Sequence, residues 1–166
     1  MPDTAPEDQL VRRLVRDTDS TALIELIATC WQEYPGCVMD VDGEEPWLRA
    51  PATAYARKAG VFWVVEQGTT VVACVGYVPH GDQAELKSLY VAKPARRRGL
   101  GAELTALVES TAVERGAREM TLWSDTRFAD AHRLYERLGY RRTGRQRDLH
   151  DLSNTTEYEF IRTLTC

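Results

Sequence analysis

The sequence predicts an α/β (α+β) fold: one mixed, mostly antiparallel sheet of about seven strands, flanked by about four helices. The first observation is size, because 166 residues with 43% hydrophobic and 28% charged side chains are typical of one domain with a substantial core. The second is the order of apolar patterns, in which strands and helices are mixed along the chain. The third is a strand–helix–strand unit over residues 85–124, whose two strands should be parallel neighbours.

Apolar runs bounded by turn residues predict the strands. The run at 71–78 is apolar on both faces, which indicates a central position in the sheet. The first run contains Leu10, Val11 and Leu14, and its spacing suits a helix as well as a strand. We expect strands at residues 9–16, 62–66, 71–78, 85–91, 119–124, 140–149 and 157–164.

Apolar positions at helical spacing predict four helices, at residues 20–34, 46–59, 100–115 and 129–138. Asp19 or Ser20 is a suitable N-cap for the first helix, and Pro35 with Gly36 ends it. In the second helix Pro51 breaks or delays the helical turns. Gly116 and Gly139 are suitable residues to terminate the other two helices.

We expect residues 1–8 to be flexible, because they are polar and contain two prolines, and residues 9–166 to form a single domain. The chain begins with no basic, apolar leader and has no apolar run of membrane-spanning length. The four cysteines form no Cys-x-x-Cys pair and lie at no zinc-ligand spacing, which is typical of reduced thiols. These features predict a cytoplasmic protein that neither binds a membrane nor carries a metal.

The net charge of −4 and the pI near 5.4 argue against a nucleic-acid-binding protein. The acidic stretch 37–46 lacks the regular ligand ladder and the closing Glu of a calcium loop, so we reject a calcium site. Arginines are concentrated in the second half of the chain, and this local positive field suits a small polyanionic ligand better than a duplex.

The stretch 85–104 predicts where that ligand binds, because it is a strand, a short basic loop and the first turn of a helix. A helix start has unpaired N–H groups and a partial positive charge, both of which favour anions. Glycines allow a ligand to approach the backbone closely, and arginine side chains suit phosphate oxygens. We therefore expect a pyrophosphate-like group on the loop formed by Arg96, Arg97, Arg98, Gly99, Leu100 and Gly101.

Two motifs occur in this part of the chain: Arg-Arg-Arg-Gly-Leu-Gly at 96–101, after a predicted strand, and Leu-Tyr-Glu-Arg-Leu-Gly-Tyr at 134–140, at the end of a predicted helix. With them the chain, over about residues 9–164, resembles the GNAT-superfamily N-acetyltransferases, which use acyl-CoA. The first motif resembles the family's Arg/Gln-x-x-Gly-x-Gly/Ala loop after its fourth strand, and the second resembles the helix of the family that ends in Leu-Tyr-x-x-x-Gly-Phe/Tyr. The resemblance implies acetyl-CoA as co-substrate and two parallel strands that splay apart at its binding site.

Carried over residue by residue, the resemblance implies that the N–H groups of Arg97 to Ala102 surround the CoA pyrophosphate. The backbone of Leu89 and Val91, on either side of Tyr90, would pair with the pantetheine arm. The Leu89 N–H would then face the thioester carbonyl and stabilise its oxyanion.

Two candidate catalytic residues follow from the same resemblance. Tyr135 lies where the family often has a general acid, and a phenol is suited to protonating a thiolate. The alternative is that Tyr135 only packs within its helix. Glu85 lies where some members have a general base; the alternative is an exposed carboxylate paired with Lys87.

One position departs from the family pattern. Many members have an Asn seven residues before the tyrosine, which hydrogen-bonds the pantetheine, but this chain has Phe128. Ser124, Asp125 or Thr126 could substitute for it, or the contact could be missing.

The acceptor is predicted from the loop that carries Asp40, Asp42, Glu44 and Glu45, with Trp31, Tyr34 and Trp47 nearby in sequence. Acid with aromatic rings suits a cationic amine, so we expect a small-molecule or amino-acid-like amine. Acetylation of a protein N-terminus or lysine, or acyl-CoA binding without turnover, are the alternatives, and a homodimer is left open. A dinucleotide fold or a P-loop is excluded, because position 104 is Leu and no Gly-Lys-Ser/Thr is present.

Overall fold

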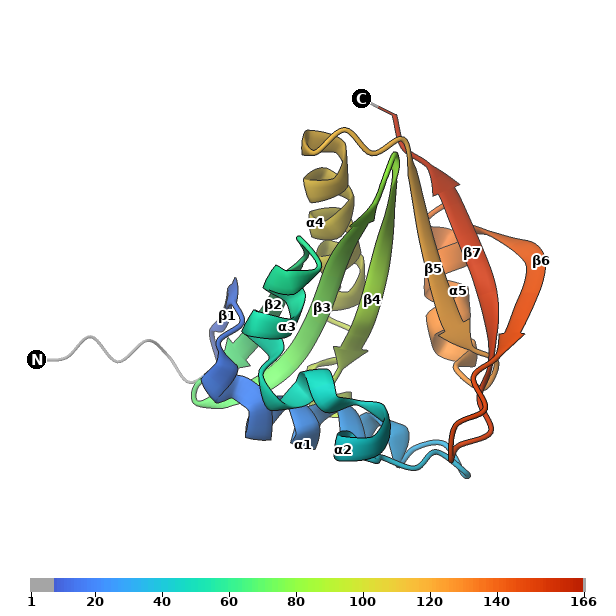
Figure 1. The fold of residues 1–166 in the computed structure, drawn as a ribbon. Helices are drawn as coiled ribbons and strands as arrows, with labels where there is room; N and C mark the ends of the chain where they lie inside the picture. Colours follow the sequence, from blue (N-terminus) through green and yellow to red (C-terminus); the bar gives the residue numbers. More distant parts are fainter. Residues whose placement is uncertain (1–7, 166) are drawn as a thin grey trace, which may run out of the picture.

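The centre of the fold is a seven-stranded mixed sheet with the strand order β1-β2-β3-β4-β5-β7-β6 (Figure 1). The computed structural model describes residues 8–165, so the expectation for the first residues of the chain lies outside the described part. The strands are β1 (Leu10–Leu14), β2 (Val61–Gln67), β3 (Thr70–His80), β4 (Gln83–Val91), β5 (Glu119–Asp125), β6 (Arg141–Asp148) and β7 (Thr156–Thr163). All seven predicted strands are confirmed, and the first apolar run is a strand rather than a helix.

Five α-helices are present in residues 8–165: α1 (Ser20–Trp31), α2 (Val41–Glu44), α3 (Pro51–Arg57), α4 (Leu100–Glu114) and α5 (Ala129–Arg137). The unpredicted one is α2, a single turn within the acidic loop, where the Asp40 carboxylate accepts a hydrogen bond from the Gly43 N–H. Pro51 delays the second predicted helix, since residues 46–49 form a 3₁₀ turn and α3 begins at the proline. Gly36, with φ +90°, lies just beyond the end of α1.

The sheet divides into two halves between β4 and β5. All other neighbouring strands are antiparallel, but β4 and β5 are parallel, and their pairing covers only Gln83↔Glu119, Ala84↔Met120 and Glu85↔Thr121. Beyond Glu85 and Thr121 the two strands no longer pair with each other, and Figure 1 shows them moving apart. The splayed parallel pair implied by the family resemblance is therefore confirmed.

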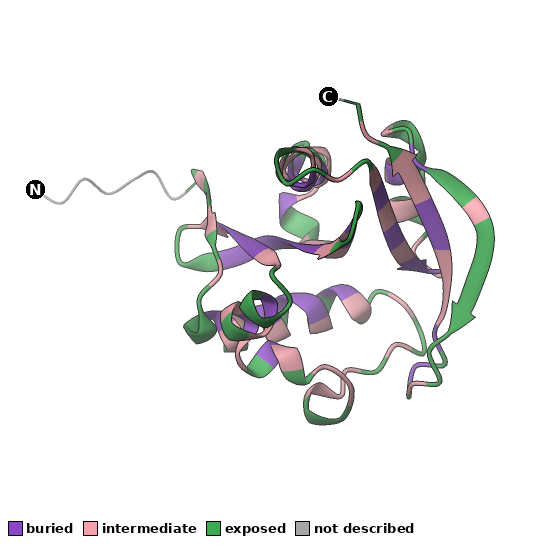
Figure 2. Cartoon of the chain, turned by 45° about the horizontal axis from the view of Figure 1, so that its top comes forward, coloured by how far each residue is buried: buried purple, intermediate pink, exposed green. Residues whose placement is uncertain are grey.

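Helices cover the two faces of the sheet and create two hydrophobic cores (Figure 2). On one face α1 and α3 pack on β2 and β3, through residues such as Leu23, Ile27 and Phe62. On the other face α4 packs on β3 and β4, and its Leu104 and Val108 are almost fully buried. Eight consecutive residues of β3, Val71–Val78, are buried, which confirms its central position.

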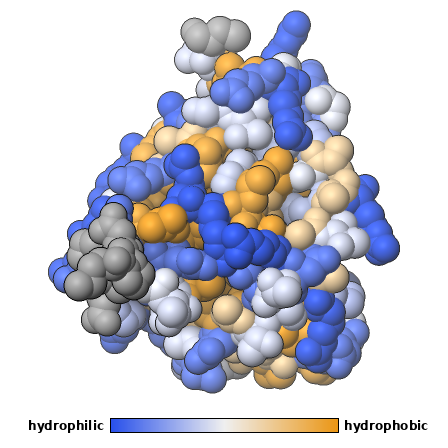
Figure 3. All heavy atoms as spheres, turned by 90° about the vertical axis from the view of Figure 1, so that its left-hand side faces the viewer, coloured by the Kyte–Doolittle hydropathy of each residue, from blue (hydrophilic) through white to orange (hydrophobic). Residues whose placement is uncertain are grey.

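The outer strands β1 and β6 have one neighbour each, and each exposes most of its residues. β6 exposes nearly every residue, four of which are arginines. β1 exposes Val11 and Leu14. On the face of the molecule that carries β1 in Figure 1, apolar atoms are interspersed with hydrophilic side chains (Figure 3), a distribution that is normal for a protein surface.

Candidate active site

The strand β4 bends just after it leaves β5. Its register with β3 shifts between Cys74, opposite Tyr90, and Gly76, opposite Lys87. Ser88 lies in this bulge with a φ of +54°, which is uncommon for a residue other than glycine. The Cys74 thiol donates a hydrogen bond to the Ser88 carbonyl, with a sulfur–oxygen distance of 3.2 Å. A bulge turns a strand and exposes its backbone, here at Leu89, the predicted oxyanion-binding residue.

A groove of about 890 Å³ runs from the splayed strands past the start of α4 to α5, and we call it the large groove. It brings together nine of the ten residues predicted to bind CoA: Leu89, Tyr90, Val91, Arg96, Arg97, Gly99, Leu100, Gly101 and Ala102. Arg98 is the exception, because it does not line the groove. The remaining wall comes from α5 and from Cys30 and Tyr34 at the end of α1.

Two positions at the start of α4 require glycine, each for a different structural reason. Gly99 has a φ of +78°, in the left-handed region that favours glycine. Gly101 has an ordinary φ but allows a close helix–helix contact, since a Cβ there would lie 2.9 Å from Leu134 Cδ2 of α5. The glycine therefore makes room for α5 as well as for a ligand at the helix N-terminus.

The three consecutive arginines also differ from one another. The Arg96 guanidinium makes a two-point ion pair with Glu33, at 2.5 and 2.6 Å, and its Nε donates to the Val91 carbonyl at 2.9 Å. Arg96 therefore links the end of α1 to the loop, and its donors are already engaged. Arg97, with φ +64°, lines the groove without an ion pair among residues 8–165.

A second, smaller hollow of about 290 Å³ lies on the α1–α3 side of the split sheet, and we call it the small cavity. Its walls come from chain segments that are far apart in sequence, from α1 to the β6–β7 loop. Seven of its residues are Trp or Tyr or Phe: Trp31, Trp47, Tyr55, Tyr90, Trp123, Phe128 and Tyr135. Its carboxylates are Glu45, Glu85, Asp125, Asp151 and Glu157, and its cations are Lys58, Lys87 and Arg147. The small cavity is therefore aromatic and net acidic.

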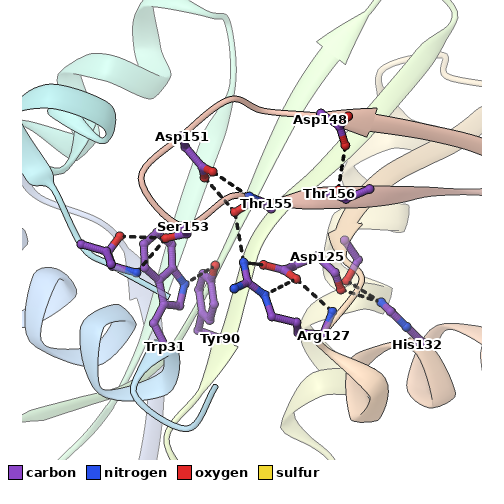
Figure 4. A network of polar contacts seen from close by, with 12 residues as sticks. Trp31, Tyr90, Asp125, Arg127, His132, Asp148, Asp151, Ser153, Thr155 and Thr156 are labelled. Carbon is purple, nitrogen blue, oxygen red and sulfur yellow. Dashed lines mark hydrogen bonds and ion pairs between the residues drawn. The ribbon is translucent and has the colours of Figure 1, made fainter. Parts of the chain in front are cut away.

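Two loops are joined to each other beside the small cavity. The Val38 N–H donates to the Ser153 hydroxyl at 2.7 Å, and that hydroxyl donates to the Val38 carbonyl at 3.2 Å (Figure 4). The Leu152 N–H donates to a Glu44 carboxylate oxygen at 3.0 Å. These bonds join the loop after α1 to the β6–β7 loop. They connect residues 115 and 108 positions apart, so no local sequence pattern indicated them.

The acidic residues that the sequence grouped together have separate tasks in the structure. Asp40 caps α2, exposed Asp42 pairs with Arg49 at 2.9 Å, and Glu44 holds the β6–β7 loop. Of these four acidic residues only Glu45 lines the small cavity. The Trp47 indole donates to one of its oxygens at 2.7 Å, and no cation lies within ion-pair distance among residues 8–165. Burial raises the pKa of the Glu45 carboxyl.

The predicted base, Glu85, lies where the pairing of β4 and β5 ends. Its carboxylate is 2.9 Å from His80 Nε2 and 3.6 Å from Lys87 Nζ, so the pairing with Lys87 that we considered is present. The side chain is 13% exposed and lines the small cavity. His80, half exposed at the end of β3, is a neighbour that the sequence reasoning missed. A histidine five residues from a glutamate, across a predicted turn, is the signal that could have indicated it.

The large groove and the small cavity meet at the predicted acid. Five residues line both hollows: Leu89, Tyr90, Phe128, Ala131 and Tyr135. The Tyr135 ring packs on Tyr140 and Phe160, at centroid distances of 5.9 and 5.8 Å, so the packing role that we considered is real.

The Tyr135 hydroxyl has no hydrogen-bond partner among residues 8–165, although every fully buried side-chain nitrogen and oxygen there has one. The hydroxyl therefore opens toward the hollows rather than into the core. Burial raises the pKa of Tyr135, so its proton is retained at neutral pH.

Phe128, at the position where relatives often have Asn, stacks on Tyr34 with a centroid distance of 4.7 Å. Of the three possible polar substitutes, Ser124 and Asp125 line the small cavity. The Ser124 hydroxyl is 3.2 Å from His132 Nε2, and Asp125 pairs with Arg127 at 2.9 Å (Figure 4). Neither polar group lines the large groove, so the aromatic pair fills this part of its wall instead.

Residues 8–165 contain no group of three or more His, Cys, Asp or Glu side chains arranged to hold a metal ion. Within the same range, no helix has the length and apolar character needed to cross a membrane.

The structure combines a split parallel strand pair, a bulge beside it and a helix N-terminus facing a groove, an arrangement that agrees with the resemblance to acyl-CoA-dependent transferases. Residues 21–140 match the family model described as the acetyltransferase (GNAT) family. Because this match covers more than half of the chain, the chain belongs to that family, and it is an acyltransferase.

Individual relatives agree with this assignment. The Escherichia coli K12 protein named uncharacterized N-acetyltransferase YjgM is 29% identical over 146 residues, which are 84% of this chain and 86% of that protein. Human N-acetyltransferase 8 is 28% identical over 120 residues, 69% of this chain and 51% of that protein. A GNAT acetyltransferase structure from Staphylococcus aureus Mu50 has a TM-score of 0.81 at 21% identity, covering 95% of this chain and all of that one.

One of the similar structures contains acetyl-CoA. It is titled as yncA, a putative acetyltransferase from Salmonella typhimurium, with its cofactor acetyl-CoA, and has a TM-score of 0.69 at 17% identity. The alignment covers 94% of this chain and 94% of that one. At this identity the similarity supports the fold.

Proposed function

We propose that this protein transfers the acetyl group of acetyl-CoA to the primary amine of a small molecule or amino-acid-like acceptor, by direct attack within a ternary complex. One observation carries the proposal: the large groove and the small cavity meet at Leu89 and Tyr135. Two ligands bound in these hollows can therefore touch end to end. No covalent enzyme intermediate is needed.

Acetyl-CoA fits the large groove. The backbone N–H groups of residues 97–102 surround its pyrophosphate at the start of α4, where the helix dipole favours negative charge. The pantetheine arm lies along Leu89 and Val91, on the side of β4 that β5 leaves unpaired. The large groove, at about 890 Å³, is of a size typical of cofactor sites.

The reaction then proceeds as a direct acyl transfer. The neutral amine nitrogen attacks the thioester carbonyl carbon, and the Leu89 N–H stabilises the oxyanion that forms. The carbon–sulfur bond breaks, and Tyr135 gives its proton to the departing thiolate. The proton of the amine passes to Glu85, directly or through a water molecule. Tyr135 is protonated at neutral pH because burial raises its pKa, so it is ready to act as the acid.

The acceptor site is the small cavity, and its chemistry favours an amine. Glu45 lines it with a carboxylate that is not neutralised by an ion pair among residues 8–165, and aromatic rings form much of the wall. Cations bind well between a carboxylate and aromatic faces. The volume of about 290 Å³ favours a small acceptor over a folded protein.

The first experiment is a calorimetric titration with acetyl-CoA, with CoA and ATP as controls. Binding of both CoA species but not of ATP is the expected result, and binding of neither would overturn the proposal. A panel of small amines, amino acids and short peptides, assayed by release of free CoA thiol, then identifies the acceptor. Turnover of peptides alone would favour the protein-directed alternative. Binding without turnover of any amine would favour an acyl-CoA sensor.

A further inference from the structure

Beyond the loop at 96–102, the large groove has a second positively charged wall. Arg133 and Arg137 of α5 both line the groove. The motif at 134–140 contains Arg137, but the sequence reasoning gave neither arginine a role in the site. They are four residues apart in one helix, so they share one face, with Cβ atoms about 5–6 Å apart. A pair at this spacing can hold one tetrahedral anion between two guanidinium groups.

The position of α5 brings this face next to the proposed pyrophosphate site. Leu134 lies between the two arginines in sequence and contacts α4 at Gly101, where a Cβ would lie 2.9 Å from its Cδ2. Arg133 and Arg137 are therefore carried on the helix that packs against the start of α4. A ligand that leaves the loop in this direction meets them next.

The charges available on this face are unequal. Arg133 pairs with Asp130, which also lines the groove, and both side chains are largely exposed. Arg137 has no carboxylate within ion-pair distance among residues 8–165. Arg137 is therefore the main unneutralised donor, with Arg133 as the second and Asp130 as a partly opposing charge.

We propose that Arg137, assisted by Arg133, binds the 3′-phosphate of the CoA nucleotide and so distinguishes CoA from its 3′-dephospho form. The inference rests on the proposed function, since it assumes that CoA occupies the large groove. A phosphomonoester carries almost two negative charges at neutral pH and has three acceptor oxygens. Guanidinium groups match these oxygens with paired donors. The same chain would bind the pyrophosphate mainly through backbone and the 3′-phosphate mainly through side chains.

The test compares the binding of CoA and 3′-dephospho-CoA to the whole protein by calorimetry. The wild type should bind CoA on the order of tenfold more tightly, as expected for one charge-assisted contact at an exposed site. Arg137→Gln should remove most of this preference while leaving the affinity for 3′-dephospho-CoA unchanged. The preference of the wild type should also decrease as ionic strength rises.

Arg141→Gln is the matched control, because it removes the same charge four residues away on β6, outside the lining of the groove. It should leave the preference intact. Equal affinity of the wild type for both nucleotides would overturn the inference, and so would an equal loss of both affinities in Arg137→Gln. Failure of the wild type to bind either nucleotide would instead contradict the proposed function.

Discussion

The two hollows of the active site differ in how they are built and in the charge they present. The large groove is formed chiefly by two continuous segments, 89–102 and 128–138, and it offers backbone N–H groups, glycines and arginines. The small cavity collects side chains from many segments between Trp31 and Glu157, and it is aromatic and net acidic. One hollow suits a polyanion and the other suits a cation.

This difference teaches which part of the molecule is open to change. A site made by local backbone geometry depends on a few residues, such as Gly99 and Gly101, that cannot be replaced without strain or collision. A site made by side chains from distant loops can change its specificity through substitutions that leave the fold intact. We expect the large groove to set the specificity for the acyl donor and the small cavity to set the specificity for the acceptor.

The largest effect should come from a change at the start of α4. Gly101→Glu places a side chain against Leu134 and a negative charge at the proposed pyrophosphate site, so acetyl-CoA affinity should fall by about 100-fold or more. Calorimetry measures this loss, and circular dichroism checks the fold. Gly101→Ala combined with Leu134→Ala makes room for the methyl group and should recover binding. Normal acetyl-CoA binding by Gly101→Glu would show that the groove was wrongly assigned.

A second change acts at the junction of the two hollows. Tyr135→Phe removes the proposed acid but keeps the ring that packs on Phe160, so turnover should fall by about 100-fold with little change in acetyl-CoA affinity. Single-turnover kinetics measure the effect. Tyr140→Phe is the control, because its hydroxyl bonds Glu109 away from both hollows and its loss should cost about 1 kcal/mol of stability only. Equal turnover of wild type and Tyr135→Phe would exclude the acid role.

A third change tests whether the acidic small cavity binds the amine. Glu45→Gln should raise KM for the amine by about tenfold without changing acetyl-CoA affinity. Asp42→Asn removes the same charge from the exposed side of the loop and should have no effect. Steady-state kinetics with varied amine separate the two variants. If they raise KM equally, the loop acts only through its overall field.

The raised pKa of Glu45 gives this prediction a pH dependence. Folding favours its protonated form, so the stability that the group contributes is lost as pH rises through its raised pKa. At neutral pH Glu45→Gln should therefore not lower the midpoint of thermal unfolding, although it weakens the binding of the amine. In the wild type, amine affinity should fall on acidification at a pH above that of an ordinary glutamate.

The smallest effect is expected at Glu85. Glu85→Gln should lower turnover only about three- to tenfold at neutral pH, because water can also take the amine proton. Activity should recover as pH rises and the amine loses its proton unaided. His80→Gln, which removes the partner 2.9 Å away, should shift the pH profile less. A loss in Glu85→Gln that persists at high pH would mean that the carboxylate binds the acceptor rather than its proton.

Local patterns were sufficient to predict the seven strands and four of the five α-helices in the described residues. The family resemblance supplied nine of the residues that line the large groove. The motif at 96–101 implied a site, but it did not distinguish Arg96, which pairs with Glu33 at a separation of 63 residues, from Arg97. The link between the two loops beside the small cavity depends on the contact of Val38 with Ser153, 115 residues apart. Such contacts are set by how the whole chain packs, so single-sequence periodicity carries no information about them.

The gap between β4 and β5 has a kinetic consequence. The groove and the cavity share Leu89 and Tyr135 beside the opening that the diverging strands leave. If acetyl-CoA and the amine occupy them as proposed, each ligand arrives through its own hollow and neither has to pass the other. We therefore expect binding in random order, with both products dissociating independently.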